Sequence, residues 1–94
     1  MNACEGFVEV VWNQILNKIK EKTSEHIFDT WFKPLRLLEK KENTLIIAVP
    51  NSFTADWLNN NYKNILFDSL FEVTGEKNDF LFLSNLHLYK NLKY

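Results

Sequence analysis

The chain has 94 residues and a net charge of −1, with 46% hydrophobic and 15% aromatic residues, a size that suits one domain. Eleven Lys and Arg residues against twelve Asp and Glu residues argue against the basic surface that tight binding of nucleic-acid phosphates needs. Cys4 is the only cysteine, so no disulfide forms within the chain, and without a membrane span or secretory signal in the sequence a cytoplasmic location is expected.

The first third of the chain predicts two helices. Apolar residues recur at helical spacing over positions 8–19, which indicates an amphipathic helix over about Glu5–Lys22. Thr23 or Ser24 is the expected N-cap of a short second helix. Pro34 ends that helix, because the residue before a proline is disfavoured in the α region.

Two strands are expected to follow as a hairpin. Leu35–Leu38 is a short strand candidate, and Thr44–Val49 is the stronger one because it is rich in β-branched residues and nearly all apolar. The polar residues Lys40–Asn43 predict the turn between them. Pro50 ends the second strand, since it has no N–H to donate to a neighbouring strand.

One long helix and a third strand complete the prediction. Asn51 or Ser52 caps the helix, and apolar residues at helical spacing continue as far as Val73. Gly75 supplies a left-handed stop at the C-terminal end of this helix. The apolar run at residues 80–83 then predicts the third strand.

The fold class predicted from this order, α-α-β-β-α-β, is α/β (α+β), with a three-stranded sheet packed against helices. We expect residues 1–84 to form an interaction domain and residues 85–94 to be a C-terminal tail or the start of a linker. The tail is unusually apolar for a linker, and it is expected to extend the last strand or to form a short helix. The order is similar to that of KH domains, but their G-X-X-G loop is absent, because the only glycines are Gly6 and Gly75.

No catalytic or metal-binding set of residues appears in the sequence. His26 and His87 are far apart, and together with Cys4 they are too few for a His/Cys metal site. The carboxylates are scattered over predicted polar faces, which favours a solvated surface over an acid–base pair. Neither of the glycine-rich phosphate-binding motifs G-x-x-x-x-G-K-[ST] and G-x-G-x-x-G occurs. We therefore expect no enzymatic activity and no cofactor.

Partly exposed aromatic residues favour protein recognition instead. Phe53 lies in the first turn of the third predicted helix, and Ile27 in the first turn of the second. Trp31 and Phe32 are adjacent, so both cannot point into one core. Exposed aromatic residues are frequent hot spots of interfaces, although packing in the core is the alternative for each of these residues. The residues expected in the core of this region are Trp57, Leu58 and Tyr62.

Five segments in this order resemble the N-terminal domain of the bacterial replication initiator DnaA. They are Trp12 with Leu16 and Ile19, F-D-T-W-F-K-P-L (28–35), L-I-I-A-V-P-N-S-F (45–53), D-W-L-N-N-N-Y (56–62) and F-E-V-T-G-E (71–76). The resemblance covers about Val8–Leu83, which is most of the chain.

The resemblance implies a KH-like domain without catalytic activity, placed ahead of an ATPase domain and an origin-binding domain. It implies that the replicative helicase and initiation regulator proteins bind through Ile27, Thr30, Trp31 and Phe53. It also implies weak self-association through Trp12 on the first helix. Some members of the family have an acidic residue where this chain has Ile27, so the helicase contact at that position departs from their pattern.

Two alternatives remain open at this point. The chain is either a fragment of a full initiator or a stand-alone regulator with the same fold, which would bind the initiator or its helicase. A weak module for single-stranded DNA is the second alternative, because Lys18, Lys20 and Lys22 gather at the end of the first predicted helix. Those lysines also suit the negative end of the helix dipole.

Overall fold

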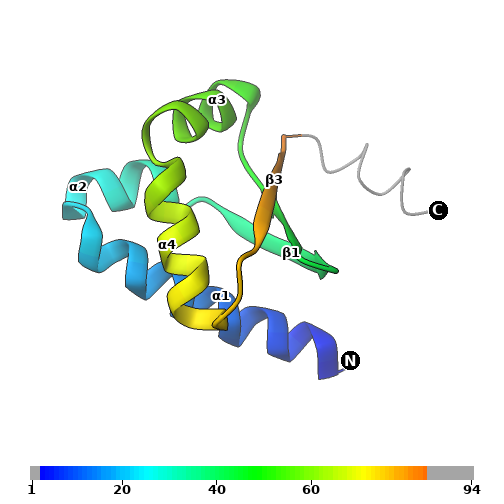
Figure 1. The fold of residues 1–94 in the computed structure, drawn as a ribbon. Coiled ribbons are helices and arrows are strands. Elements are labelled where there is room, and N and C mark those ends of the chain that lie inside the picture. Colours follow the sequence, from blue (N-terminus) through cyan, green and yellow to red (C-terminus); the bar gives the residue numbers. More distant parts are fainter. Residues whose placement is uncertain (1–2, 85–94) are drawn as a thin grey trace.

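The structure, a computed structural model, describes residues 3–84. The helices and strands surround one core (Figure 1) and confirm the α+β class. In chain order they are α1 (Ala3–Lys22), α2 (Glu25–Ile27), η1 (Phe28–Phe32), β1 (Arg36–Lys41), β2 (Thr44–Ala48), α3 (Ser52–Asn61), α4 (Lys63–Thr74) and β3 (Asp79–Leu83). The predicted tail, residues 85–94, lies outside the described residues.

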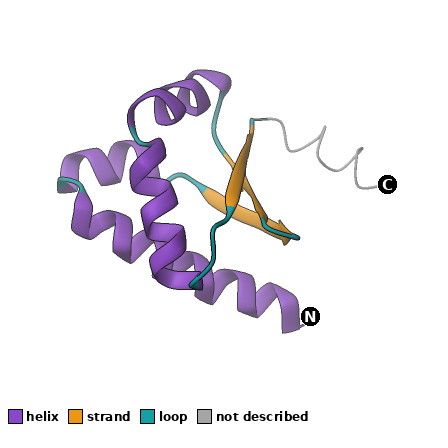
Figure 2. Cartoon of the chain, viewed as in Figure 1, coloured by secondary structure: helices purple, strands orange, loops and turns teal. Residues whose placement is uncertain are grey.

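The sheet has the strand order β1-β2-β3, with β1 antiparallel and β3 parallel to the central strand β2. A parallel neighbour requires a crossover connection, and α3 and α4 supply it. Figure 2 shows the strands in the centre of the view with helices above, below and to the left. On β2, Leu45 and Ile47 pair with Phe80 and Phe82 of β3, which carries one apolar face across both strands.

The hairpin turn has fewer residues than the predicted turn Lys40–Asn43. β1 continues to Lys41, whose partner on β2 is Thr44, so only two residues form the turn. Glu42 adopts a positive φ of 56° there, a left-handed conformation that closes such short connections. The predicted strand Leu35–Leu38 was therefore too short, because polar Lys40 and Lys41 still pair with β2 at the edge of the sheet.

The prediction of one long third helix was wrong, because the helix is interrupted at Tyr62. The backbone there has φ −129° and ψ 17°, which separates α3 from α4. Three asparagines precede the break, and short polar side chains compete with helical hydrogen bonds. Asn61 does so directly, since its side-chain amide donates to the Trp57 carbonyl at 2.9 Å. The predicted stop at Gly75 is confirmed by its φ of 75°.

The short helical region after α1 contains a π-turn, which the spacing of apolar residues did not predict. The backbone N–H of Lys33 donates to the Phe28 carbonyl, five residues back, at 2.9 Å. Ser24 is the N-cap, because its hydroxyl accepts from the Ile27 N–H at 3.2 Å. The region ends at Phe32, next to the predicted position, but Lys33 keeps a right-handed helical backbone with φ −57° and ψ −37°. The expectation that Pro34 moves Lys33 out of the α region was therefore wrong, and the helix stops because Pro34 has no N–H to donate.

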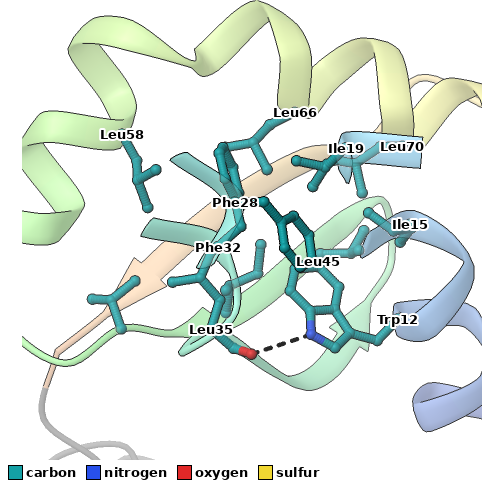
Figure 3. Packing of buried hydrophobic residues seen from close by; sticks show 12 residues of the cluster. Trp12, Ile15, Ile19, Phe28, Phe32, Leu35, Leu45, Leu58, Leu66 and Leu70 are labelled. Atoms are coloured by element: carbon teal, nitrogen blue, oxygen red, sulfur yellow. Dashed lines mark hydrogen bonds between the residues drawn. The ribbon is translucent and has the colours of Figure 1, made fainter. Parts of the chain in front are cut away.

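The core lies between α1, α4, the π-turn and the sheet, as the close view in Figure 3 shows. Its buried members are Trp12, Ile15, Ile19, Phe28, Phe32, Leu35, Leu45, Ile47, Val49, Leu58, Leu66 and Leu70. The ammonium of Lys22 at the end of α1 reaches both carboxylate oxygens of Glu72 on α4 at 3.0 Å. In the described part of the chain, no helix has both the length and the apolar character needed to cross a bilayer.

Candidate protein-docking surface

Six aromatic rings form a series of neighbours in space that runs from the core to the surface. The distances between neighbouring ring centroids are 6.4 Å for Phe28–Phe32, 5.4 Å for Phe32–Tyr62, 5.1 Å for Tyr62–Trp57, 3.9 Å for Trp57–Trp31 and 6.2 Å for Trp31–Phe53. Phe28 at the inner end is buried and Phe32 beside it is fully buried, whereas Phe53 at the outer end is 65% exposed. The exposed ring therefore belongs to a continuous series of rings that starts in the core.

Trp31 and Phe32, the adjacent pair on η1, divide between surface and core as the sequence predicted. Phe32 is fully buried and meets the Tyr62 ring edge to face, with an 80° angle between the ring planes. Trp31 is half-buried, and its indole stacks on that of Trp57. The break at Tyr62 and the π-turn at Trp31 are thus the two irregular points of the backbone that place these rings.

Phe53 owes its exposure to the way in which α3 begins. Asn51 has an extended backbone, and its side-chain oxygen accepts from the Thr54 N–H at 2.8 Å and from the Thr54 hydroxyl at 3.0 Å. This is the N-cap predicted from the sequence. Phe53 is then the second residue of the helix, and its side chain projects from the first turn toward solvent.

The prediction that Trp57 belongs to the core was wrong. It is half-buried, and so is Tyr62, whereas Leu58 is fully buried as predicted. Phe53 and Trp57 are four residues apart, and residues at that spacing lie on the same face of a helix. That spacing was the available signal in the sequence. We call Trp31, Phe53 and Trp57 together the aromatic patch.

Of the four residues assigned to partner binding from the resemblance, the structure brings Trp31 and Phe53 into contact. Thr30 is exposed and directly precedes Trp31 on η1. Ile27 is half-buried and packs against the core, so only part of its side chain is accessible. The accessible apolar surface in this region is consequently carried by the aromatic patch rather than by Ile27.

Trp12, the predicted self-association residue, is 6% exposed and lies in the core. Its indole N–H donates to the Leu35 carbonyl at 3.3 Å, a bond drawn in Figure 3 that ties α1 to the residue just before β1. Trp12 also contributes to the lining of a surface groove of about 520 Å³ between α1 and β1. The groove is the part of its surroundings that a second molecule can reach.

The arrangement can bury apolar surface against another molecule. Across residues that the structure describes, no three His, Cys, Asp or Glu side chains gather to hold a metal ion. Exposed aromatic rings with fixed positions are costly to leave in water and favourable to bury in an interface. The aromatic patch is therefore the candidate docking surface.

Comparison with known proteins agrees with the resemblance seen in the sequence. The family model "DnaA N-terminal domain" matches residues 9–71, which include Trp12 and the whole aromatic patch. A chromosomal replication initiator protein DnaA from Thermodesulfovibrio yellowstonii is 39% identical over 70 residues, covering 74% of this chain and 16% of that protein. The protein of the same name from Treponema denticola is 36% identical over 69 residues, covering 73% of this chain and 15% of its own length.

Proposed function

This chain belongs to the DnaA N-terminal domain family, and we propose that it is a non-catalytic, cytoplasmic docking domain of a replication initiator. In this proposal the aromatic patch binds the replicative helicase and, at other times, regulators of initiation. The chain spans about one sixth of the length of the relatives it matches. The activities of a whole initiator are therefore not assigned to this chain, which would work as one part of such a protein.

The observation that carries the proposal is the exposed Phe53 ring at the end of a ring series anchored in the core. A flexible exposed side chain loses conformational entropy when a partner immobilises it. Phe53 contacts Trp31, and Trp31 stacks on Trp57, so part of that cost is already met in the free domain. Well-ordered aromatic side chains in a partly apolar surface are the residues that dominate binding energy in interfaces.

Helicase and regulators would compete for this surface, because the patch consists of only three rings. Thr30, exposed beside Trp31, adds a hydroxyl that can donate or accept one hydrogen bond. The accessible part of Ile27 adds apolar area. Since Ile27 replaces an acidic residue of some family members, the helicase contact proposed here rests on burial of apolar surface rather than on an ion pair.

Self-association through the region of Trp12 is a second element of the proposal. The buried indole would act by holding α1 against the residue before β1, while the groove beside it and the 57% exposed Val10 present apolar surface. An apolar surface made only of this groove and Val10 would support weak pairing of initiators. Residues 1–84 would form the interaction domain, and residues 85–94 would be a C-terminal tail or the start of a linker.

The direct test is calorimetric titration of the replicative helicase of the same organism with the 94-residue chain and two variants. Phe53→Ala is expected to weaken binding by about 1–2 kcal/mol or more, the usual effect of truncating a hot-spot residue. Leu81→Ala is the matched control, because Leu81 is 53% exposed on β3, outside the patch. Equal affinities of Phe53→Ala and the unmodified chain would remove the patch from the helicase contact.

A further inference from the structure

A second groove lies at the end of α4 that is remote from α3. Figure 1 shows the connection from α4 to β3 on the opposite side of the molecule from α3. The groove has a volume of about 740 Å³, within the range of sites that hold small ligands or side chains. Its lining residues come from the β1–β2 turn, α4, the connection from α4 to β3 and the start of β3: Asn43, Phe67, Asp68, Phe71, Lys77, Asn78 and Asp79.

Phe71 provides the free apolar surface of this groove. It is 53% exposed, whereas Phe67 is half-buried and packs against Phe80 with centroids 4.9 Å apart. The Phe67 ring also has the Lys63 ammonium 5.8 Å from its centroid. Phe71 has no ring contact with another residue in the described part of the chain. An exposed phenylalanine at the edge of a hollow favours the burial of a second apolar group there.

The carboxylates that line the groove differ from neighbouring carboxylates in their ion pairing. Nearby Glu72 and Glu76 form ion pairs with Lys22 and Lys40, at 3.0 Å and 3.7 Å. Among residues 8–84, by contrast, neither Asp68 nor Asp79 has an ion-pair partner. Lys77 is the single cation in the lining, so two carboxylates against one ammonium leave an excess negative charge.

Asn78 adds an unsatisfied acceptor to the same lining. It is 4% exposed, and its side-chain N–H groups donate to the Thr74 hydroxyl at 2.8 Å and to the Glu76 carbonyl at 3.2 Å. Its side-chain oxygen has no donor within the described part of the chain. Buried polar atoms without a partner are uncommon in native proteins and destabilise them. An acceptor of this kind in the lining favours a bound molecule that brings a hydrogen-bond donor.

We propose that this groove docks a segment of a partner protein that carries a basic side chain next to an apolar one. The apolar side chain would pack on Phe71, and the basic group would lie between Asp68 and Asp79 with an N–H available to Asn78. The excess of carboxylates opposes nucleic acid, because phosphates need cations. The groove and the aromatic patch adjoin opposite ends of the α3–α4 unit, so two partners can occupy the domain together.

The test is a titration of the ¹⁵N-labelled 94-residue chain with N-acetyl-Leu-Arg-amide, followed by amide chemical shifts. We expect saturable shifts at residues 67–71 and 77–79, and about two- to fivefold weaker binding of N-acetyl-Leu-Glu-amide, the change typical of one exposed ion pair. Shifts of equal size with both peptides, or shifts confined to the aromatic patch, would overturn the proposal. So would shifts at the groove that grow with protein concentration alone, because they would assign it to a second copy of the chain.

Two variants with matched controls separate the apolar contribution from the charged one. Phe71→Gln should weaken binding of the Arg peptide at least about fivefold, whereas Val10→Gln, at a similarly exposed site on α1, should not. Asp68→Asn should weaken the preference for Arg over Glu, and Asp56→Asn on α3 should preserve it. If all four variants bind like the unmodified chain, the groove is not a docking site. The result is independent of helicase binding at Phe53, so the two proposals can fail separately.

Discussion

The indole rings of Trp31 and Trp57 stack with centroids 3.9 Å apart and planes 9° apart. One ring comes from the π-turn that precedes β1 and the other from α3, which follows β2. The stack therefore joins two segments that are distant in the chain at the site where Phe53 is exposed. The aromatic patch is a product of tertiary packing, and its rings cannot be changed independently of one another.

Trp57→Ala should lower both stability and partner binding. The substitution removes the ring on which Trp31 stacks and the contact with Tyr62 at 5.1 Å. Because Trp57 is only half-buried, we expect a loss of about 1–3 kcal/mol in the free energy of unfolding, less than for a fully buried tryptophan. Urea denaturation measures it. A loss as large as that of Leu58→Ala would show that Trp57 is part of the core.

Asn51→Ala should destabilise the domain by about 1 kcal/mol, because it removes the side chain that caps α3. Thermal unfolding measures the change, with the exposed neighbour variant Ser52→Ala as the control. The loss of the cap should also raise the amide exchange rates of the first turn of α3. An unchanged exchange rate at Thr54, whose N–H bonds to Asn51, would contradict the assigned role.

Trp12→Phe should reduce the stability of the domain, because it removes the hydrogen bond from the indole N–H to the Leu35 carbonyl. The Leu35 carbonyl would lose its buried donor, and we expect a cost of about 1–3 kcal/mol. Val10→Asp provides the comparison, because Val10 is 57% exposed on α1. That variant should weaken self-association in sedimentation equilibrium while stability stays nearly constant. If Val10→Asp leaves self-association unchanged, the α1 surface near Trp12 is not the interface.

Gly75→Ala should destabilise the end of α4 by about 1–2 kcal/mol, since an L-residue is strained at a φ of 75°. No atom lies within 4 Å of the added methyl group, so backbone strain is the only expected cause. Gly75→Asn should cost less, because asparagine tolerates the left-handed region. Equal losses for the two variants, measured by urea denaturation, would argue against this cause.

Features governed by neighbouring residues were predictable from the sequence. The repeat of apolar residues on α1, the cap at Asn51 and the stop at Gly75 depend on local spacing and on single side chains. The strands β2 and β3 also follow from short apolar runs. Comparison of all these elements with the structure shows agreement in type, with differences mainly at their ends.

Features that depend on contacts between distant segments were not predictable in the same way. Helical spacing continues through Tyr62, so the apolar pattern hides the break, although the three asparagines before it are a local signal. The π-turn likewise leaves the spacing of the apolar residues almost unchanged. Trp57 looked like a core residue because hydrophobicity does not distinguish a ring inside the core from one stacked at its border.

The most direct test of the docking function is an amide NMR titration of the 94-residue chain with the replicative helicase from the same organism. We expect shifts or broadening centred on Trp31, Phe53 and Trp57, and we expect Phe53→Ala to reduce them. Single-stranded DNA should cause far weaker changes, since the chain carries no excess of cations. Changes with single-stranded DNA but none with helicase would contradict the docking function and favour a nucleic-acid-binding module.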